Sequence, residues 1–144
     1  MTSYSQKKVL KTNTLSFIYN FYMRFLALIC LGFSIFYWLR LVGIFPGALW
    51  RFDLMPLQWQ YLSGTLAIAY PIALIGLWMY SQWGIVLWCI AAVVETLAMT
   101  VYHSDFIYQP LLPLLHGTLF LILIIFKAIM SFKKIKRKVP TINL

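Results

Sequence analysis

The sequence predicts an all-α membrane protein, an antiparallel four-helix transmembrane bundle with both the N and C termini in the cytoplasm. Of its 144 residues, 62% are hydrophobic and 10% are charged, whereas soluble domains carry about 25% charged residues. The apolar residues form four continuous blocks, each about 20 residues long, which is the length of helix that crosses a bilayer. Lysine and arginine concentrate at the two chain ends, and basic residues beside membrane spans stay on the cytoplasmic side.

The membrane domain is predicted to cover residues 17–132, between a basic N-terminal segment, 1–16, and a basic tail, 133–144. Backbone groups in lipid must be hydrogen-bonded within one helix or within a closed barrel. A barrel would show alternating strands of about ten residues, whereas these blocks are continuous. The helical spans are therefore expected at about residues 17–42, 59–79, 83–102 and 111–132.

The connection between the first two spans carries two formal charges, Arg51 and Asp53. We interpret them as a surface ion pair, and Asp53 also as a cap for the helix that follows. Both residues remain candidates for a site in the outer loop. Trp50, Trp59 and Tyr61 are expected in the aromatic belt at the membrane interface, where amphipathic rings prefer to lie.

The second span combines a row of small residues with a proline. Thr65, Ala69, Ala73 and Gly76 follow at helical spacing, and such rows let membrane helices approach closely. We therefore expect Ala69 and Ala73 at a helix–helix contact. Pro71 lacks a backbone N–H, so it leaves the carbonyl of Ala67 without its helical partner.

Glu95, the only glutamate in the chain, lies within the third span. An ionisable residue at membrane depth is a functional-site candidate. At helical spacing it shares a face with small and aromatic residues, which we expect to point into the bundle. That face consists of Trp88, Ala91, Ala92, Ala98, Met99 and Tyr102, and the opposite, lipid-facing side of Leu87, Ile90, Val94, Leu97 and Val101.

Three polar residues on three spans are expected in the outer half of the membrane. Counting 1.5 Å per residue puts Glu95 about 10 Å, His116 about 8 Å and Arg40 about 3 Å below the outer boundary. Arg40 should extend its guanidinium group to the lipid headgroups. The three residues form either an outward-opening site in which Glu95 exchanges a proton, or a structural network. In the network Glu95 pairs with Arg40 or His116, or is protonated and bonded to a neighbour.

The net charge of +9 does not indicate a nucleic-acid partner, because the charges lie at the chain ends. There they set topology and attract anionic lipid. Cys30 and Cys89 lie in separate apolar blocks without a nearby Cys or His, so no redox pair or zinc site is predicted. Only His116 is expected at membrane depth, whereas haem held by two histidines needs two. We predict no catalytic residue, metal ligand or cofactor.

Several motifs resemble one protein family in their order and spacing. They are FYWLRLVGIFPG, WRFDLMPLQWQ, PIALIGLW, SQWG, AAVVE and LLHG, and they cover about residues 21–125. The family is a domain-of-unknown-function family of small four-span inner-membrane proteins from alphaproteobacteria. The resemblance implies a multi-pass protein of the bacterial inner membrane and implies no activity.

We therefore expect a non-catalytic accessory or interaction subunit of the cell envelope, which packs against a membrane-protein partner or a second copy of itself. The alternative is a small proton-coupled transporter or lipophilic-ligand binder that uses Glu95. Small multidrug transporters are similar in scale, but they place their glutamate in the first span instead of the third. An enzyme fits least, because no set of chemical groups for quinone or lipid chemistry is found in the sequence.

Overall fold

The structure, a computed structural model, describes residues 2–101 and 110–138, and within them it contains helices and no strand. The helices are α1 (Thr2–Val42), α2 (Leu57–Trp78), α3 (Gln82–Thr100) and α4 (Leu111–Lys138), with a short 3₁₀ helix, η1 (Ala48–Trp50), after α1. Each of the four long helices contains a stretch long and apolar enough to cross a membrane. This confirms the predicted all-α architecture. α1 begins at Thr2, so the helix also includes the basic segment that precedes the predicted span.

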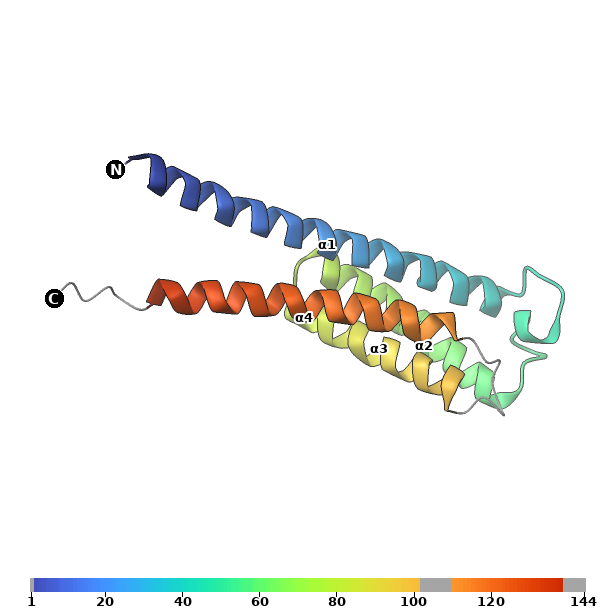
Figure 1. The fold of residues 1–144 in the computed structure, drawn as a ribbon. Helices are drawn as coiled ribbons and strands as arrows, with labels where there is room; N and C mark the ends of the chain where they lie inside the picture. Colours follow the sequence, from blue (N-terminus) through green and yellow to red (C-terminus); the bar gives the residue numbers. More distant parts are fainter. Residues whose placement is uncertain (1, 102–109, 139–144) are drawn as a thin grey trace.

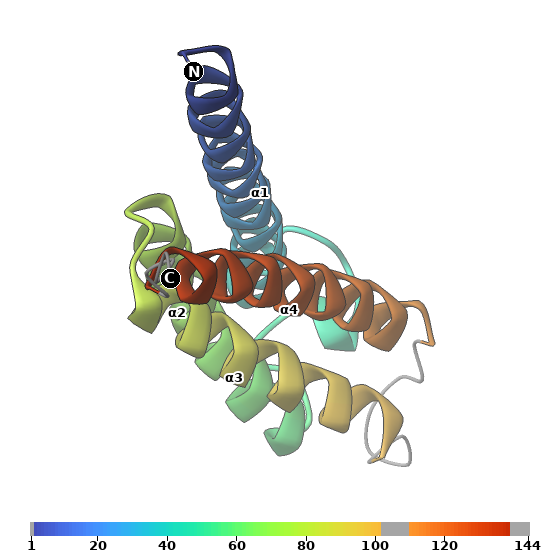
Figure 2. The same cartoon turned by 60° about the vertical axis from the view of Figure 1, so that its left-hand side comes forward.

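The helices pack in chain order, α1 on α2, α2 on α3 and α3 on α4. The beginning of α1 and the end of α4 lie at the same end of the molecule, as expected for an antiparallel bundle (Figure 1). Figure 2 shows α4 on the near side of the other three helices. The connection from α1 to α2 lies at the end of the bundle opposite the termini (Figure 1).

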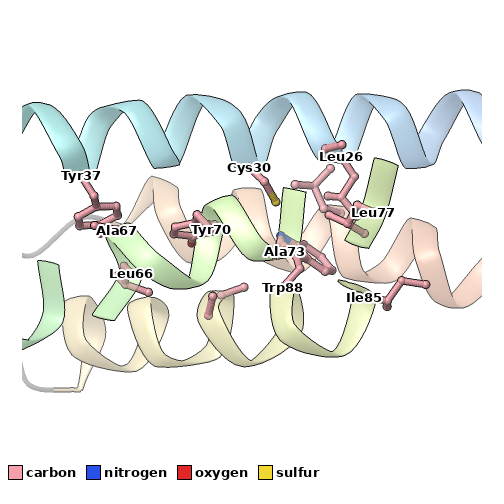
Figure 3. Packing of buried hydrophobic residues seen from close by; sticks show 14 of the residues in the cluster. Leu26, Cys30, Tyr37, Leu66, Ala67, Tyr70, Ala73, Leu77, Ile85 and Trp88 are labelled. Atoms are coloured by element: carbon pink, nitrogen blue, oxygen red, sulfur yellow. The ribbon is translucent and has the colours of Figure 1, made fainter. Parts of the chain in front are cut away.

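One face of α1 forms much of the core, because its buried residues recur every three or four positions. They are Met23, Leu26, Ala27, Cys30, Ser34 and Tyr37. Toward one end of the bundle Leu26 lies near Leu77 and Ile85, and toward the other end Tyr37 and Tyr70 lie between α1 and α2 (Figure 3).

The turn between α2 and α3 holds these helices as close antiparallel neighbours. The N–H of Tyr80 donates to the carbonyl of Leu77 at 3.1 Å, and the N–H of Ser81 donates to that of Gly76 at 2.9 Å. With Tyr80 at a φ of 56°, this is the Schellman pattern of helix ends. Just beyond the turn Gly76 meets Gly84 so closely that a Cβ on Gly84 would lie 2.3 Å from the carbonyl carbon of Gly76.

The predicted row of small residues on α2 is wrong at its beginning. Thr65 is exposed and donates to the carbonyl of Tyr61 at 2.7 Å, whereas Ala69 is partly buried and packs against the core as predicted. Ala73 and Gly76 are buried. The face of α2 that packs inside the bundle also contains large side chains, among them Leu66, Tyr70 and Leu77.

Pro71 has the predicted consequence for the carbonyl of Ala67. The indole N–H of Trp38 on α1 donates to this carbonyl at 3.0 Å. A carbonyl that has lost its helical donor is costly in an apolar medium unless another donor replaces it. The proline on α2 thus creates an acceptor that ties α2 to α1.

Candidate functional site

All four helices contribute one side chain to a polar centre around Glu95. The hydroxyl of Tyr37 on α1 donates to Oε1 of Glu95, and the hydroxyl of Tyr70 on α2 donates to Oε2. Nε2 of His116 on α4 lies 3.7 Å from the same Oε2. Glu95 itself is 1% exposed. We call these four residues the Glu95 centre.

The geometry of the Glu95 centre suits an ionised carboxylate, because both oxygens accept a hydrogen bond from a phenol and an ionised carboxylate only accepts. The ring of Phe33 covers the centre, with centroid distances of 5.0 Å to Tyr70 and 5.4 Å to His116. Nδ1 of His116 lies 3.4 Å from Oγ1 of Thr96. The carboxyl group of Glu95 therefore lies among hydrogen-bond donors and aromatic rings supplied by the other helices.

The face of α3 that was predicted to point inward does so. Trp88, Ala91, Ala92, Glu95, Ala98 and Met99 are buried, and Tyr102 lies outside the described residues. On the opposite side Ile90, Val94, Leu97 and Val101 are exposed, while Leu87 is partly buried. The predicted contact between Glu95 and His116 is also confirmed, whereas no ion pair joins Glu95 to Arg40 among the residues that the structure describes.

The prediction that Arg40 extends to the headgroups is wrong. Arg40 is 6% exposed, and its guanidinium carbon lies over three aromatic rings, 4.4 Å from the centroid of Trp59, 5.2 Å from Phe36 and 5.4 Å from Trp50. The chain after α1 folds back and brings Trp50 and Trp59 over the guanidinium group. Trp59 is 3% exposed, so its predicted place in an interfacial belt is also wrong.

A cavity of about 380 Å³ lies between Arg40 and the Glu95 centre. Arg40, Tyr37 and Glu95 supply its polar groups. The rest of the lining is apolar or aromatic: Ile29, Gly32, Phe33, Phe36, Trp59, Met99 and Leu112. Pockets of this size with few polar groups in an apolar wall are typical of small-molecule sites.

Arg51 and Asp53 form the predicted ion pair and lie apart from the cavity. Nη2 of Arg51 is 2.8 Å from Oδ2 of Asp53, and their side chains are 50% and 61% exposed. Asp53 does not cap the following helix, because Pro56 holds the position before α2 and no side chain caps it. The pair is a solvent-facing contact of the connection.

The sequence analysis missed Tyr37 and Tyr70. Both are tyrosines well inside an apolar span instead of at its ends, where interfacial tyrosines lie. A buried tyrosine hydroxyl normally finds a partner, so this position is the signal that could have identified them. For metals, no group of three or more His, Cys, Asp or Glu side chains that could hold an ion is found in residues 2–101 and 110–138.

The fold and the site together define an all-α protein with four membrane-length apolar helices around a buried carboxyl group and an adjoining cavity. The chain belongs to the family of unknown function DUF6163, whose model matches residues 17–134. No curated protein and no solved structure matches the chain.

Proposed function

We propose that this protein is a non-catalytic multi-pass membrane protein that binds a lipophilic small molecule in the cavity between Arg40 and the Glu95 centre. The observation that carries the proposal is the cavity itself, about 380 Å³ lined mostly by aromatic and aliphatic side chains, with Arg40 and Glu95 as its ionisable groups. Such a cavity takes an apolar body and orients it by a few polar contacts.

The arrangement of Glu95 favours a binding protein over a proton-coupled transporter. Both carboxylate oxygens are engaged by Tyr37 and Tyr70, so the group is fixed between helices. A carboxyl group that carries protons across a membrane must exchange with water during the cycle. In this protein Glu95 fixes the positions of the helices that line the cavity, and the bound molecule contacts the other lining residues.

We place the protein in the bacterial inner membrane with both termini in the cytoplasm, where the basic ends contact anionic lipid. The cavity then lies in the outer half of the bilayer. Reporter fusions at Ser81 and Leu144 should report cytoplasm, and fusions at Gly47 and Ser104 should report the outer side. A cytoplasmic signal at Gly47 would reverse the orientation.

The test of binding uses glycine positions that tolerate a side chain. Gly32 lines the cavity, and a Cβ there meets nothing within 4 Å. Gly32→Phe should fill the cavity without disturbing the helices. Gly64→Phe is the matched control, because Gly64 has the same free space and does not line the cavity.

The full chain is extracted from native membranes in mild detergent, and its bound small molecules are identified by mass spectrometry. Wild type and Gly64→Phe should carry a lipophilic molecule that Gly32→Phe lacks, with equal thermal stability of all three. The proposal is wrong if wild type carries none, or if Gly32→Phe retains the same molecule in full.

A role as an accessory or interaction subunit is the second candidate, and the position of α4 favours it. Only 17% of the apolar stretch of α4 is buried inside the molecule, against 44% for α2 and α3. A partner protein or a second copy would cover part of that face. Native mass spectrometry of the protein released from membranes tests this, since a subunit should appear in a complex of fixed stoichiometry and a free binding protein as a monomer.

A further inference from the structure

Arg40 is a buried cation with a side-chain N–H that no described residue accepts. It is 6% exposed, and its Nε has no hydrogen-bond partner in the part of the chain that the structure describes. The rings of Trp59, Trp50 and Phe36 attract the positive charge, but they supply no oxygen to accept its N–H groups. A buried charge in a protein is normally both paired and hydrogen-bonded.

The acidic residues with described positions are already engaged. Asp53 is held by Arg51 at 2.8 Å, and Glu95 accepts from Tyr37 and Tyr70. The third acidic residue of the chain, Asp105, lies outside the described residues. Arg40 therefore forms no ion pair within residues 2–101 and 110–138, and the carboxyl group of Glu95, which lines the same cavity of about 380 Å³, acts on it only through space.

The lining of this cavity combines two kinds of chemistry. Arg40 offers N–H donors in a planar fork that matches carboxylate and phosphate oxygens. The apolar part of the lining includes Ile29, Met99 and Leu112, which contact hydrocarbon favourably. A molecule that satisfies both has an oxyanion at one end and a hydrocarbon chain behind it.

We propose that Arg40 binds the oxyanion head of an amphipathic molecule, a carboxylate or phosphate on an acyl chain, whose chain occupies the cavity beside Met99 and Leu112. This inference rests on the proposed function and adds the chemical class of the ligand. The Glu95 centre takes no part in binding the head, because both carboxyl oxygens of Glu95 are already hydrogen-bonded to Tyr37 and Tyr70.

The experiment measures binding of oleate, methyl oleate and dioleoyl phosphatidylglycerol to the full chain in neutral detergent by native mass spectrometry. Methyl oleate has the same chain as oleate without the negative charge. Wild type should bind oleate, the phosphatidylglycerol or both at least about tenfold more tightly than methyl oleate, as expected for charge-assisted hydrogen bonds. Preference for oleate identifies a free carboxylate as the head, and preference for the phospholipid identifies a headgroup phosphate.

Arg40→Met removes the charge and retains an apolar side chain of similar length, so it should abolish this preference. Arg51→Met is the control, because Arg51 is an arginine in the connection after α1 that lies outside the cavity. It should leave binding unchanged. In the absence of ligand, Arg40→Met should be at least as thermally stable as wild type, since replacing a buried unpaired charge by an apolar group is neutral or stabilising.

Four results would overturn the inference. In the first, methyl oleate binds as tightly as oleate. In the second, Arg40→Met still prefers the charged molecules to methyl oleate. Either result leaves the proposed function in place but requires a different class of ligand. Equal thermal destabilisation by Arg40→Met and Asp105→Asn would identify Asp105 as the partner of Arg40. Absence of binding of all three molecules, with no native lipophilic molecule sensitive to Gly32→Phe, would reject the proposed function itself.

Discussion

Replacing Gly84 by alanine should force α2 and α3 apart. The new Cβ would lie 2.3 Å from the carbonyl carbon of Gly76, and ordinary contact begins at 3.4 Å, so the helices must separate by 3.4 − 2.3 = 1.1 Å. The contact is backbone against backbone, and no side-chain rotation relieves it. Overpacking of a tight contact costs about 1–3 kcal/mol.

A matched variant separates this clash from the general effect of alanine in a helix. Gly64→Ala lies on α2, where a Cβ meets nothing within 4 Å. It should raise the free energy of unfolding by about 0.5–1 kcal/mol, because glycine is the poorer helix former. Gly84→Ala gains the same benefit but also has the clash, so it should lower the free energy of unfolding by about 1–2 kcal/mol.

The assay is equilibrium unfolding by sodium dodecyl sulfate in mixed micelles, followed by tryptophan fluorescence and by helical circular dichroism. The two variants should differ by about 1.5–3 kcal/mol in the free energy of unfolding. If Gly84→Ala is as stable as Gly64→Ala, the close approach of α2 and α3 at Gly76 is not present in the protein, and the reasoning fails.

The remaining predictions concern the buried hydrogen bonds. Tyr70→Phe removes a donor to Glu95 and should lower the free energy of unfolding by about 1–2 kcal/mol, whereas Tyr61→Phe, at a position that is 70% exposed, should leave it unchanged in the same assay. Glu95→Gln should remain folded and retain the bound molecule in native mass spectrometry, because the phenol hydroxyls can accept from the amide as well as donate to it. Loss of the ligand from a fully stable Gln variant would show that the charge of Glu95 contacts the ligand. Trp38→Phe should cost about 1 kcal/mol in thermal or detergent unfolding, because the carbonyl of Ala67 then lacks a donor.

Hydropathy and helical spacing were sufficient to predict the four helices and the inward face around Glu95. The length of each apolar block predicts a membrane-length helix, and the spacing of small residues on α3 predicts which of its faces packs inside the bundle. The acceptor created at Ala67 by Pro71 was also predictable, because it follows from the missing N–H of proline. These are properties of one segment at a time.

The partners of Glu95 and Arg40 depend on how segments are placed relative to one another. The positions of Tyr37 and Tyr70 within apolar spans indicate that their hydroxyls need partners but not which partners, and only the relative shift of α1, α2 and α3 brings them to one carboxyl group. Arg40 is at a span end, where exposure is the usual outcome. The connection that brings Trp59 over it contains no repeating pattern from which its path could be read.

The loose attachment of α4 determines how a molecule would reach the cavity. α4 is held by the hydroxyl of Tyr22 donating to the carbonyl of Leu119 at 2.5 Å, by Lys127 donating to Gln82 at 3.0 Å, by ring contacts of Phe126 and by His116 of the Glu95 centre. Only 17% of its apolar stretch is buried, against 44% for α2 and α3. Leu112, at the start of this helix, forms part of the cavity wall. Because weakly packed elements open at low free energy, α4 is the wall that we expect to open first. If the protein binds a lipophilic molecule within a membrane, as proposed, that molecule would enter sideways from the surrounding leaflet, with its chain leading and its head following to the guanidinium group, without crossing water.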